Sequence, residues 1–98
     1  MPRLSDDDVR AALIDGLPDW THYDDAIKKE FAFKGFIAAI EFIDRLAVEA
    51  QAARHHPDLE IHYNRVLVSL STHDEGGVTE LDVALARAIE AVAHPPEA

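Results

Sequence analysis

Histidine is the side chain in this sequence best suited to chemistry near neutral pH, because its imidazole both takes up and releases a proton there. The 98-residue chain holds six histidines. Four of them lie between Arg54 and Asp74, namely His55, His56, His62 and His73. Two imidazoles of different protonation can carry out general acid–base catalysis, in which one removes a proton and the other supplies one.

Three interpretations of these histidines are open. The first is a metal site, since neutral imidazole is a common metal ligand, although no H-E-x-x-H spacing occurs and the adjacent His55 and His56 do not easily share one ion. The second is structural, because a histidine pair suits the negative end of a helix dipole. The third is metal-free acid–base catalysis. Residue types alone do not decide among them.

Other polar residues offer weaker signals. Ser71, His73 and Asp74 are close in sequence but lack the G-x-S-x-G turn of a nucleophilic serine. Gly76-Gly77 is too short for a phosphate-binding loop and indicates a turn. Asp82 follows Thr79 by three residues, which is the spacing of a helix N-terminal capping box. We therefore expect Asp82 to cap a helix.

Composition and charge exclude several classes of function. Nineteen acidic residues against nine basic ones give a formal net charge of −10, which disfavours nucleic acid and anionic membranes as partners. The absence of cysteine excludes disulfides, thiolate nucleophiles and cysteine-ligated metal centres. The polar start lacks a signal-peptide core, and no stretch approaches the ~20 apolar residues of a membrane span. We expect one soluble cytoplasmic domain over residues 1–98.

Helical periodicity predicts three helices. Ser5 caps the first, whose apolar residues recur every fourth position until Gly16 and Pro18 stop it. The second and longest runs from Lys34 to about Arg54. The third begins at the Thr79 cap, and Pro95-Pro96 stops it. Phe31, Phe33, Phe36 and Phe42 are expected in the core.

Alternating patterns predict strands between these helices. Trp20–His22 is expected to pair with Ala26–Phe33 as a hairpin around Asp24-Asp25. Lys29 falls on the apolar side of the second segment, which indicates an edge position or a side chain that reaches out to solvent. Ile61–Thr72 is predicted as one strand. The order of elements predicts an α+β fold with helices on one face of an antiparallel sheet.

A single strand over Ile61–Thr72 would separate the histidines. About ten extended residues span roughly 33 Å. His55 and His73 could then meet only if the loop from Pro57 to Leu59 folds back, or if a neighbouring strand brings one end round to the other.

A longer set of residues resembles a known family. The run Phe31-x-Phe33-x-x-Phe36-x-x-Ala39-x-x-Phe42 is followed by His55-His56-Pro57-Asp58, Tyr63-Asn64-x-Val66, Ser71-Thr72-His73-Asp74, Gly77 and Asp82. From about Trp20 to Val92 the sequence resembles the pterin-4a-carbinolamine dehydratase family. The His-His-Pro element followed by Tyr-Asn and Ser-Thr-His is highly specific at these spacings.

This resemblance implies a two-layer fold of three helices on one face of a four-stranded antiparallel sheet. It implies a homotetramer built as a dimer of dimers, with sheets joined edge to edge, and we expect this chain to form a homo-oligomer, a dimer or a tetramer. The implied reaction removes water from 4a-hydroxytetrahydropterin without a metal or an organic cofactor and gives quinonoid dihydropterin. That reaction recycles the pterin used by aromatic amino acid hydroxylases, which are the implied pathway partners.

The resemblance also implies the residues of the site. His55, His56 and His73 take the catalytic positions, with His73 and His55 as the acid–base pair and His56 orienting the ring. The segments that would contact the pterin are Arg54–His56 and Ser71–Asp74, that is Arg54, His55, His56, Ser71, Thr72, His73 and Asp74.

Two residues depart from the family pattern. Gln51 stands where the family usually has a glutamate, and glutamine can form a hydrogen bond but cannot stabilise an imidazolium by charge. Leu59 stands where some members carry an aromatic residue, and leucine stacks less well on a pterin ring. The three histidines are intact, so we expect a dehydratase. The alternative is a catalytically weak member that acts as a protein-binding, coactivating or stabilising module.

Overall fold

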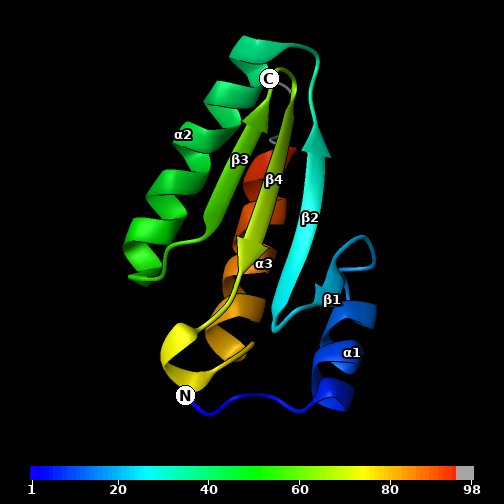
Figure 1. The fold of residues 1–98 in the computed structure, drawn as a ribbon. Helices are drawn as coiled ribbons and strands as arrows, with labels where there is room; N and C mark the ends of the chain where they lie inside the picture. Colours follow the sequence, from blue (N-terminus) through cyan, green and yellow to red (C-terminus); the bar gives the residue numbers. More distant parts are fainter. Residues whose placement is uncertain (95–98) are drawn as a thin grey trace.

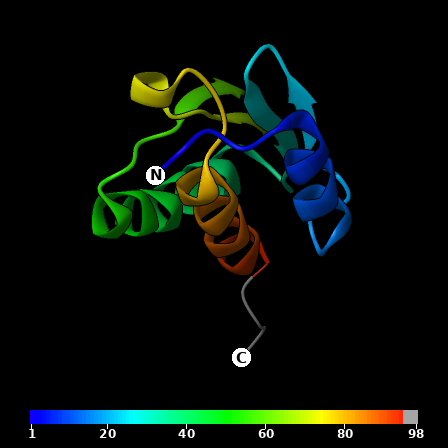
Figure 2. The same cartoon turned by 90° about the horizontal axis from the view of Figure 1, so that it is seen from below.

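A computed structural model of the protein describes residues 1–94 as an antiparallel sheet with helices on one face (Figure 1). The strands lie in the order β1-β2-β4-β3, and α2 and α3 pack side by side beneath them (Figure 2). The predicted α+β class is confirmed. The elements are α1 (Asp6–Ile14), β1 (Thr21–Tyr23), β2 (Ala26–Ala32), α2 (Phe36–Ala53), β3 (Asp58–His62), β4 (Arg65–Leu70), a short 3-10 helix η1 (His73–Glu75) and α3 (Glu80–Ala93).

Two of the three predicted helices, α1 and α3, begin at their predicted caps. The Ser5 hydroxyl accepts a hydrogen bond from the Asp8 backbone N–H at 3.1 Å, and Thr79 and Asp82 form the predicted capping box of α3. No helix within residues 1–94 is both long and apolar enough to cross a membrane. The predicted stop at Pro95-Pro96 lies outside the described residues.

The prediction of one strand over Ile61–Thr72 is wrong, because the chain reverses at Tyr63-Asn64. The segment forms the hairpin of β3 and β4, and Tyr63 adopts a left-handed conformation with φ 54°. The side-chain amide of Asn64 donates to the carbonyl of Phe33 at 2.9 Å, while the Phe33 N–H donates to the Asn64 carbonyl at 2.8 Å. These bonds fix the turn against the end of β2. The prediction failed because the β-forming residues around the turn masked it.

This hairpin decides where the histidines lie. Asp58, the first residue of β3, is paired with Ser69 near the end of β4. The residues just before β3 and those just after β4 therefore occupy the same end of the sheet. In Figures 1 and 2 the end of α2, η1 and the start of α3 gather there.

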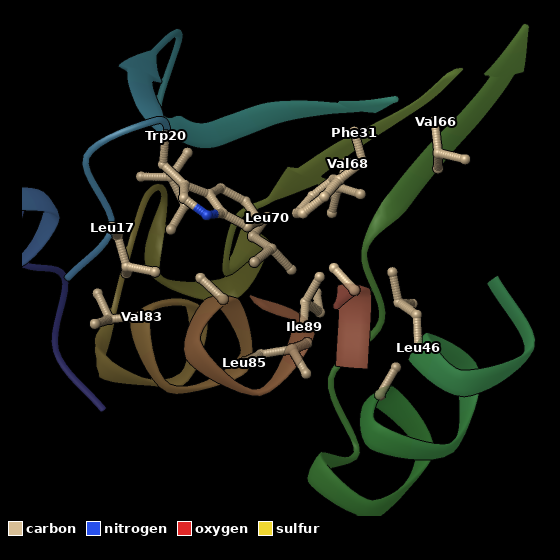
Figure 3. Close-up of a cluster of buried hydrophobic side chains, with 14 of the residues drawn as sticks. Leu17, Trp20, Phe31, Leu46, Val66, Val68, Leu70, Val83, Leu85 and Ile89 are labelled. Atoms are coloured by element: carbon tan, nitrogen blue, oxygen red, sulfur yellow. The ribbon is translucent and has the colours of Figure 1, made fainter. Parts of the chain in front are cut away.

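The core lies between the sheet and the helices (Figure 3). Phe42 of α2 is fully buried, and its ring centroid lies 4.9 Å from those of both Phe31 and Phe33. Phe36 was expected in this core but is 47% exposed, because it opens α2 at the margin of the layer. Core packing thus anchors α2 to the sheet along its length through Ala39, Phe42, Leu46 and Ala50.

Lys29 does not lie on an edge strand, nor does its side chain extend into solvent. β2 lies between β1 and β4, and the Lys29 side chain is only 13% exposed. Its ammonium pairs with Glu90 of α3, which also accepts a hydrogen bond from the Trp20 indole N–H at 2.9 Å. The alternation of apolar and polar residues along β2 is interrupted at Lys29 because this residue forms an ion pair with Glu90 of α3. A charge that is mostly buried needs such a partner.

Candidate functional site

A histidine and a fully buried carboxylate form the centre of the candidate site. The side chain of Asp82, in the first turn of α3, is 0% exposed, and that of His55 is 12% exposed. The Nε2 atom of His55 hydrogen-bonds directly to Oδ1 of Asp82. A carboxylate bound to an imidazole fixes the ring's orientation and its tautomer, as in the triads of hydrolases.

The end of α2 places His55 against α3. Arg54 adopts the left-handed conformation with φ 53°, and its backbone N–H bonds the carbonyls of Ala50 and Gln51. The His55 N–H bonds the Ala50 carbonyl at 3.1 Å, so the chain turns back over the helix end. Pro57 then prevents any continuation of the helix.

Two threonines complete the surroundings of Asp82. The Thr72 hydroxyl is 2.8 Å from Oδ2 of Asp82 and 2.9 Å from the Thr79 hydroxyl. The Thr79 backbone N–H donates to the same Oδ2 at 2.9 Å. Within residues 1–94 no buried side-chain nitrogen or oxygen lacks a hydrogen-bond partner. The polar cluster under His55 is therefore fully satisfied, which holds it in one arrangement.

His56, the neighbour of His55, lies outside this cluster. Its Nε2 is 3.1 Å from the side-chain oxygen of Gln51 on the last turns of α2. Gln51 therefore contacts a histidine of the site, although it is a neutral group where the family usually has a glutamate. Leu59, the second departure, is 38% exposed on β3 opposite Val68.

His73 lies in η1 and lines a surface depression of about 350 Å³. Asp24 and Asp25 of the β1–β2 turn also line it, as do Ser69 and Ser71 at the end of β4. The Ser71 hydroxyl donates to the Asp25 carbonyl at 2.8 Å, which ties the turn to the site. His55 and His56 do not line this depression. Asp74 lies beside His73 and is exposed.

The structure thus brings the predicted residues to one end of the sheet without joining the three imidazoles directly. Within residues 1–94 no histidine ring hydrogen-bonds another, and no group of three or more His, Asp and Glu side chains could hold a metal ion. Thr72 connects the two parts, because its hydroxyl bonds the carboxylate that holds His55 while its neighbours Ser71 and His73 line the depression.

Asp82 was predicted correctly as a helix cap but not as the partner of His55. The capping signal is local, involving Thr79 three residues earlier. The histidine contact joins residues 27 positions apart and depends on the β3–β4 hairpin. Its position in the family pattern was the only sign in the sequence that Asp82 does more than cap α3.

Arg3, in the N-terminal segment, contacts a residue that lines the depression. Its guanidinium pairs with Asp25 at 3.1 Å, and its side chain passes directly over Gly77. A Cβ added at Gly77 would lie 2.7 Å from Nε of Arg3, closer than real contacts allow. Glycine at position 77 therefore leaves room for the Arg3 side chain to cross the loop after η1 and reach Asp25 in the β1–β2 turn.

Comparison with known proteins identifies the family of this two-layer fold. The family model described as "Pterin 4 alpha carbinolamine dehydratase" matches residues 2–92. The chain belongs to this family, which confirms the resemblance of its histidine, tyrosine–asparagine and serine–threonine–histidine motifs.

Two relatives illustrate the similarity, and both carry the name "Putative pterin-4-alpha-carbinolamine dehydratase". The protein from Picosynechococcus sp. is 49% identical over 84 residues, covering 86% of this chain and 90% of the relative. The protein from Thermomicrobium roseum is 46% identical over 93 residues, covering 95% of this chain and 99% of the relative.

Two solved structures share the fold. A Brucella melitensis protein described as a transcriptional coactivator/pterin dehydratase superposes with a TM-score of 0.89 at 41% identity, covering 94% of this chain and 99% of that one. A pterin dehydratase-like protein identified as a RuBisCO assembly factor gives a TM-score of 0.62 at 24% identity, over 76% of this chain and 86% of that one. The second likeness concerns the fold alone.

Gly77→Ala is expected to lower the free energy of unfolding by about 0.5 kcal/mol, because the new methyl group displaces the flexible Arg3 side chain from its exposed ion pair with Asp25. Urea unfolding measures this change. In an Arg3→Ala background the effect of Gly77→Ala should vanish. An equal loss in both backgrounds would show that Arg3 is not the cause.

Proposed function

We propose that this chain is a 4a-hydroxytetrahydropterin dehydratase, a carbon–oxygen hydro-lyase that yields quinonoid dihydropterin. The observation that carries the proposal is the pair of His55 and buried Asp82, linked through Thr72 to the loop of His73. Family membership supports a pterin as the substrate. Regenerating the pterin cofactor of aromatic amino acid hydroxylases is the role that this reaction would serve.

The reaction needs one proton removed and one supplied. The C4a–O bond breaks, the departing hydroxyl takes a proton and leaves as water, and the N5 proton is lost as the C4a–N5 double bond forms. No electron is gained from or lost to another reactant. General acid–base catalysis of this kind typically contributes about 10²–10⁴-fold. We assign the two transfers to His55 and His73, and the orientation of the pterin to His56.

We propose that the depression beside His73 is the pterin-binding site. Its volume, about 350 Å³, falls within the range of about 300–1,000 Å³ found for small-molecule sites. Ser71 and His73 line it, and the loop carrying Arg54, His55 and His56 lies at the same end of the sheet. The segments Arg54–His56 and Ser71–Asp74 are accordingly proposed to contact the substrate.

We also propose that the protein is a homotetramer or a homodimer. Every residue of β3 is exposed, and this edge strand has no pairing partner on its outer side within residues 1–94. Unpaired strand edges favour pairing with another chain. Phe36, Ile37 and Val48 of α2 are also exposed, at 47%, 68% and 66%. Light scattering tests the assembly, and a monomer at all concentrations would contradict it.

The exposed apolar side chains of α2 also favour a second candidate function, a protein-binding or stabilising role. In that case binding of a partner would survive loss of the histidines and fail when Ile37 or Val48 becomes charged. Catalysis should be lost with the histidines and should survive a charge at Ile37 or Val48, because neither of these two side chains lines the depression.

His55→Ala and His73→Ala are each expected to lower the rate of dehydration by about 10²–10⁴-fold. Stopped-flow absorbance measures the decay of 4a-hydroxytetrahydropterin generated in place. His62→Ala is the control, because that ring is 58% exposed on β3 and pairs only with Glu60. Folded His55 and His73 variants with full activity would contradict the proposal, as would a wild type no faster than buffer.

Gln51→Glu is expected to raise the dehydration rate by about threefold, because a carboxylate 3.1 Å from His56 would hold that ring through a charge-assisted hydrogen bond. The same stopped-flow measurement tests it. Glu41→Gln provides a control at an exposed acid of the same helix. A rate unchanged or lowered by Gln51→Glu would show that the family glutamate is not needed in this chain.

A further inference from the structure

The hydroxyls of Thr79 and Thr72 form a chain of hydrogen bonds. Counting donors and acceptors shows which hydroxyl donates to which. Each hydroxyl carries one proton. The Thr79 hydroxyl accepts from the Leu81 backbone N–H at 3.2 Å, and its one remaining neighbour is the Thr72 hydroxyl at 2.9 Å. Thr79 is 0% exposed, so its proton must go to Thr72. The Thr72 proton is then donated to Oδ2 of Asp82, 2.8 Å away.

This hydroxyl chain determines which atoms of Asp82 can accept from His55. Oδ2 receives two donors, the Thr72 hydroxyl and the Thr79 backbone N–H. Oδ1 is left for the imidazole of His55. Because an ionised carboxylate only accepts hydrogen bonds, Nε2 of His55 must carry the proton in that contact.

The remaining nitrogen of His55 is the one available for chemistry. Nδ1 makes no hydrogen bond with any residue of 1–94, and the side chain keeps 12% of its surface exposed. In the neutral ring Nδ1 carries the lone pair that takes up a proton, and in the charged ring Nδ1–H donates it. Because the ring is held through Nε2, Nδ1 is left without a hydrogen-bond partner among residues 1–94.

We infer that Thr72 is a positioning residue of the dehydratase, whose hydroxyl holds Asp82 so that His55 reacts through Nδ1. The inference rests on the proposed function for its catalytic consequence, but the state of His55 in the free protein is independent of turnover. The hydroxyl of Thr72 acts through Asp82, because its only proton is already donated to the carboxylate, so the proposed contact of Thr72 with the pterin would use its other atoms.

The decisive variants are Thr72→Val and Thr72→Ser. Valine keeps the shape of threonine but removes both the donor to Asp82 and the acceptor of the Thr79 proton, whereas serine keeps the hydroxyl. Thr21→Val is the matched control, because the exposed Thr21 hydroxyl on β1 makes one long contact of 3.4 Å to the Lys28 carbonyl. Thr72→Ala serves as a second deletion if valine prevents folding.

Two readouts test the inference. Two-bond ¹H–¹⁵N NMR at a pH where the ring is neutral distinguishes its tautomers, and we expect the Nε2–H form of His55 in wild type and Thr72→Ser. In Thr72→Val the Nε2–H tautomer should persist, because the ionised carboxylate still only accepts, but the Nε2–H proton should exchange with solvent faster than in wild type and Thr72→Ser, since Asp82 has lost one of the donors that hold it. Stopped-flow kinetics should show kcat about tenfold lower in Thr72→Val, KM within about twofold, and recovery in Thr72→Ser.

Several outcomes would overturn the inference. An Nδ1–H tautomer in the wild type would show that Asp82 does not accept from Nε2. A folded Thr72→Val or Thr72→Ala with unchanged exchange of the His55 Nε2–H proton and unchanged kcat would show that Thr72 does not position the pair. If wild type lacked dehydration but showed the Nε2–H tautomer with a slowly exchanging proton, and Thr72→Val lost that slow exchange, the proposed function would fall while the arrangement of Thr72, Asp82 and His55 would stand.

Discussion

The candidate site depends on one buried carboxylate. A charge with no exposure to solvent must be matched by hydrogen-bond donors, or burying it would destabilise the fold. Asp82 meets this requirement with the backbone N–H of Thr79, the hydroxyl of Thr72 and the imidazole of His55. These donors come from the start of α3, the end of β4 and the loop after α2. Satisfying a single side chain therefore holds three separate segments in place.

The topology makes this convergence possible. Antiparallel pairing of β3 with β4 sets Asp58 opposite Ser69, so the loop after α2 and the loop after β4 leave the same end of the sheet. Packing of Phe42 against Phe31 and Phe33 anchors α2 to that sheet. Contacts of Ser71 and Arg3 with Asp25 hold the β1–β2 turn beside the depression of His73. The core thus positions residues that the chain separates, while the polar contacts set their orientation.

Much of the fold could be predicted from the sequence, because helix periodicity and local caps such as Ser5 and Thr79 are short-range signals. The β3–β4 turn was missed, since Tyr63 and its neighbours read as one continuous strand. The histidines were found by residue type and by resemblance to the family. The contact of His55 with Asp82 could not be found by spacing, because it exists only after the hairpin and α3 have packed.

The most direct test of a carboxylate-held histidine as the basis of catalysis is the dehydration rate of Asp82→Asn, measured by stopped flow with a check of folding. Both donors on Oδ2 require the amide oxygen of the introduced asparagine, so its NH₂ group would face His55 and favour the wrong tautomer. The account predicts a folded protein whose kcat is lower by about 10²–10⁴-fold. A folded variant that dehydrates the pterin at the wild-type rate would contradict it.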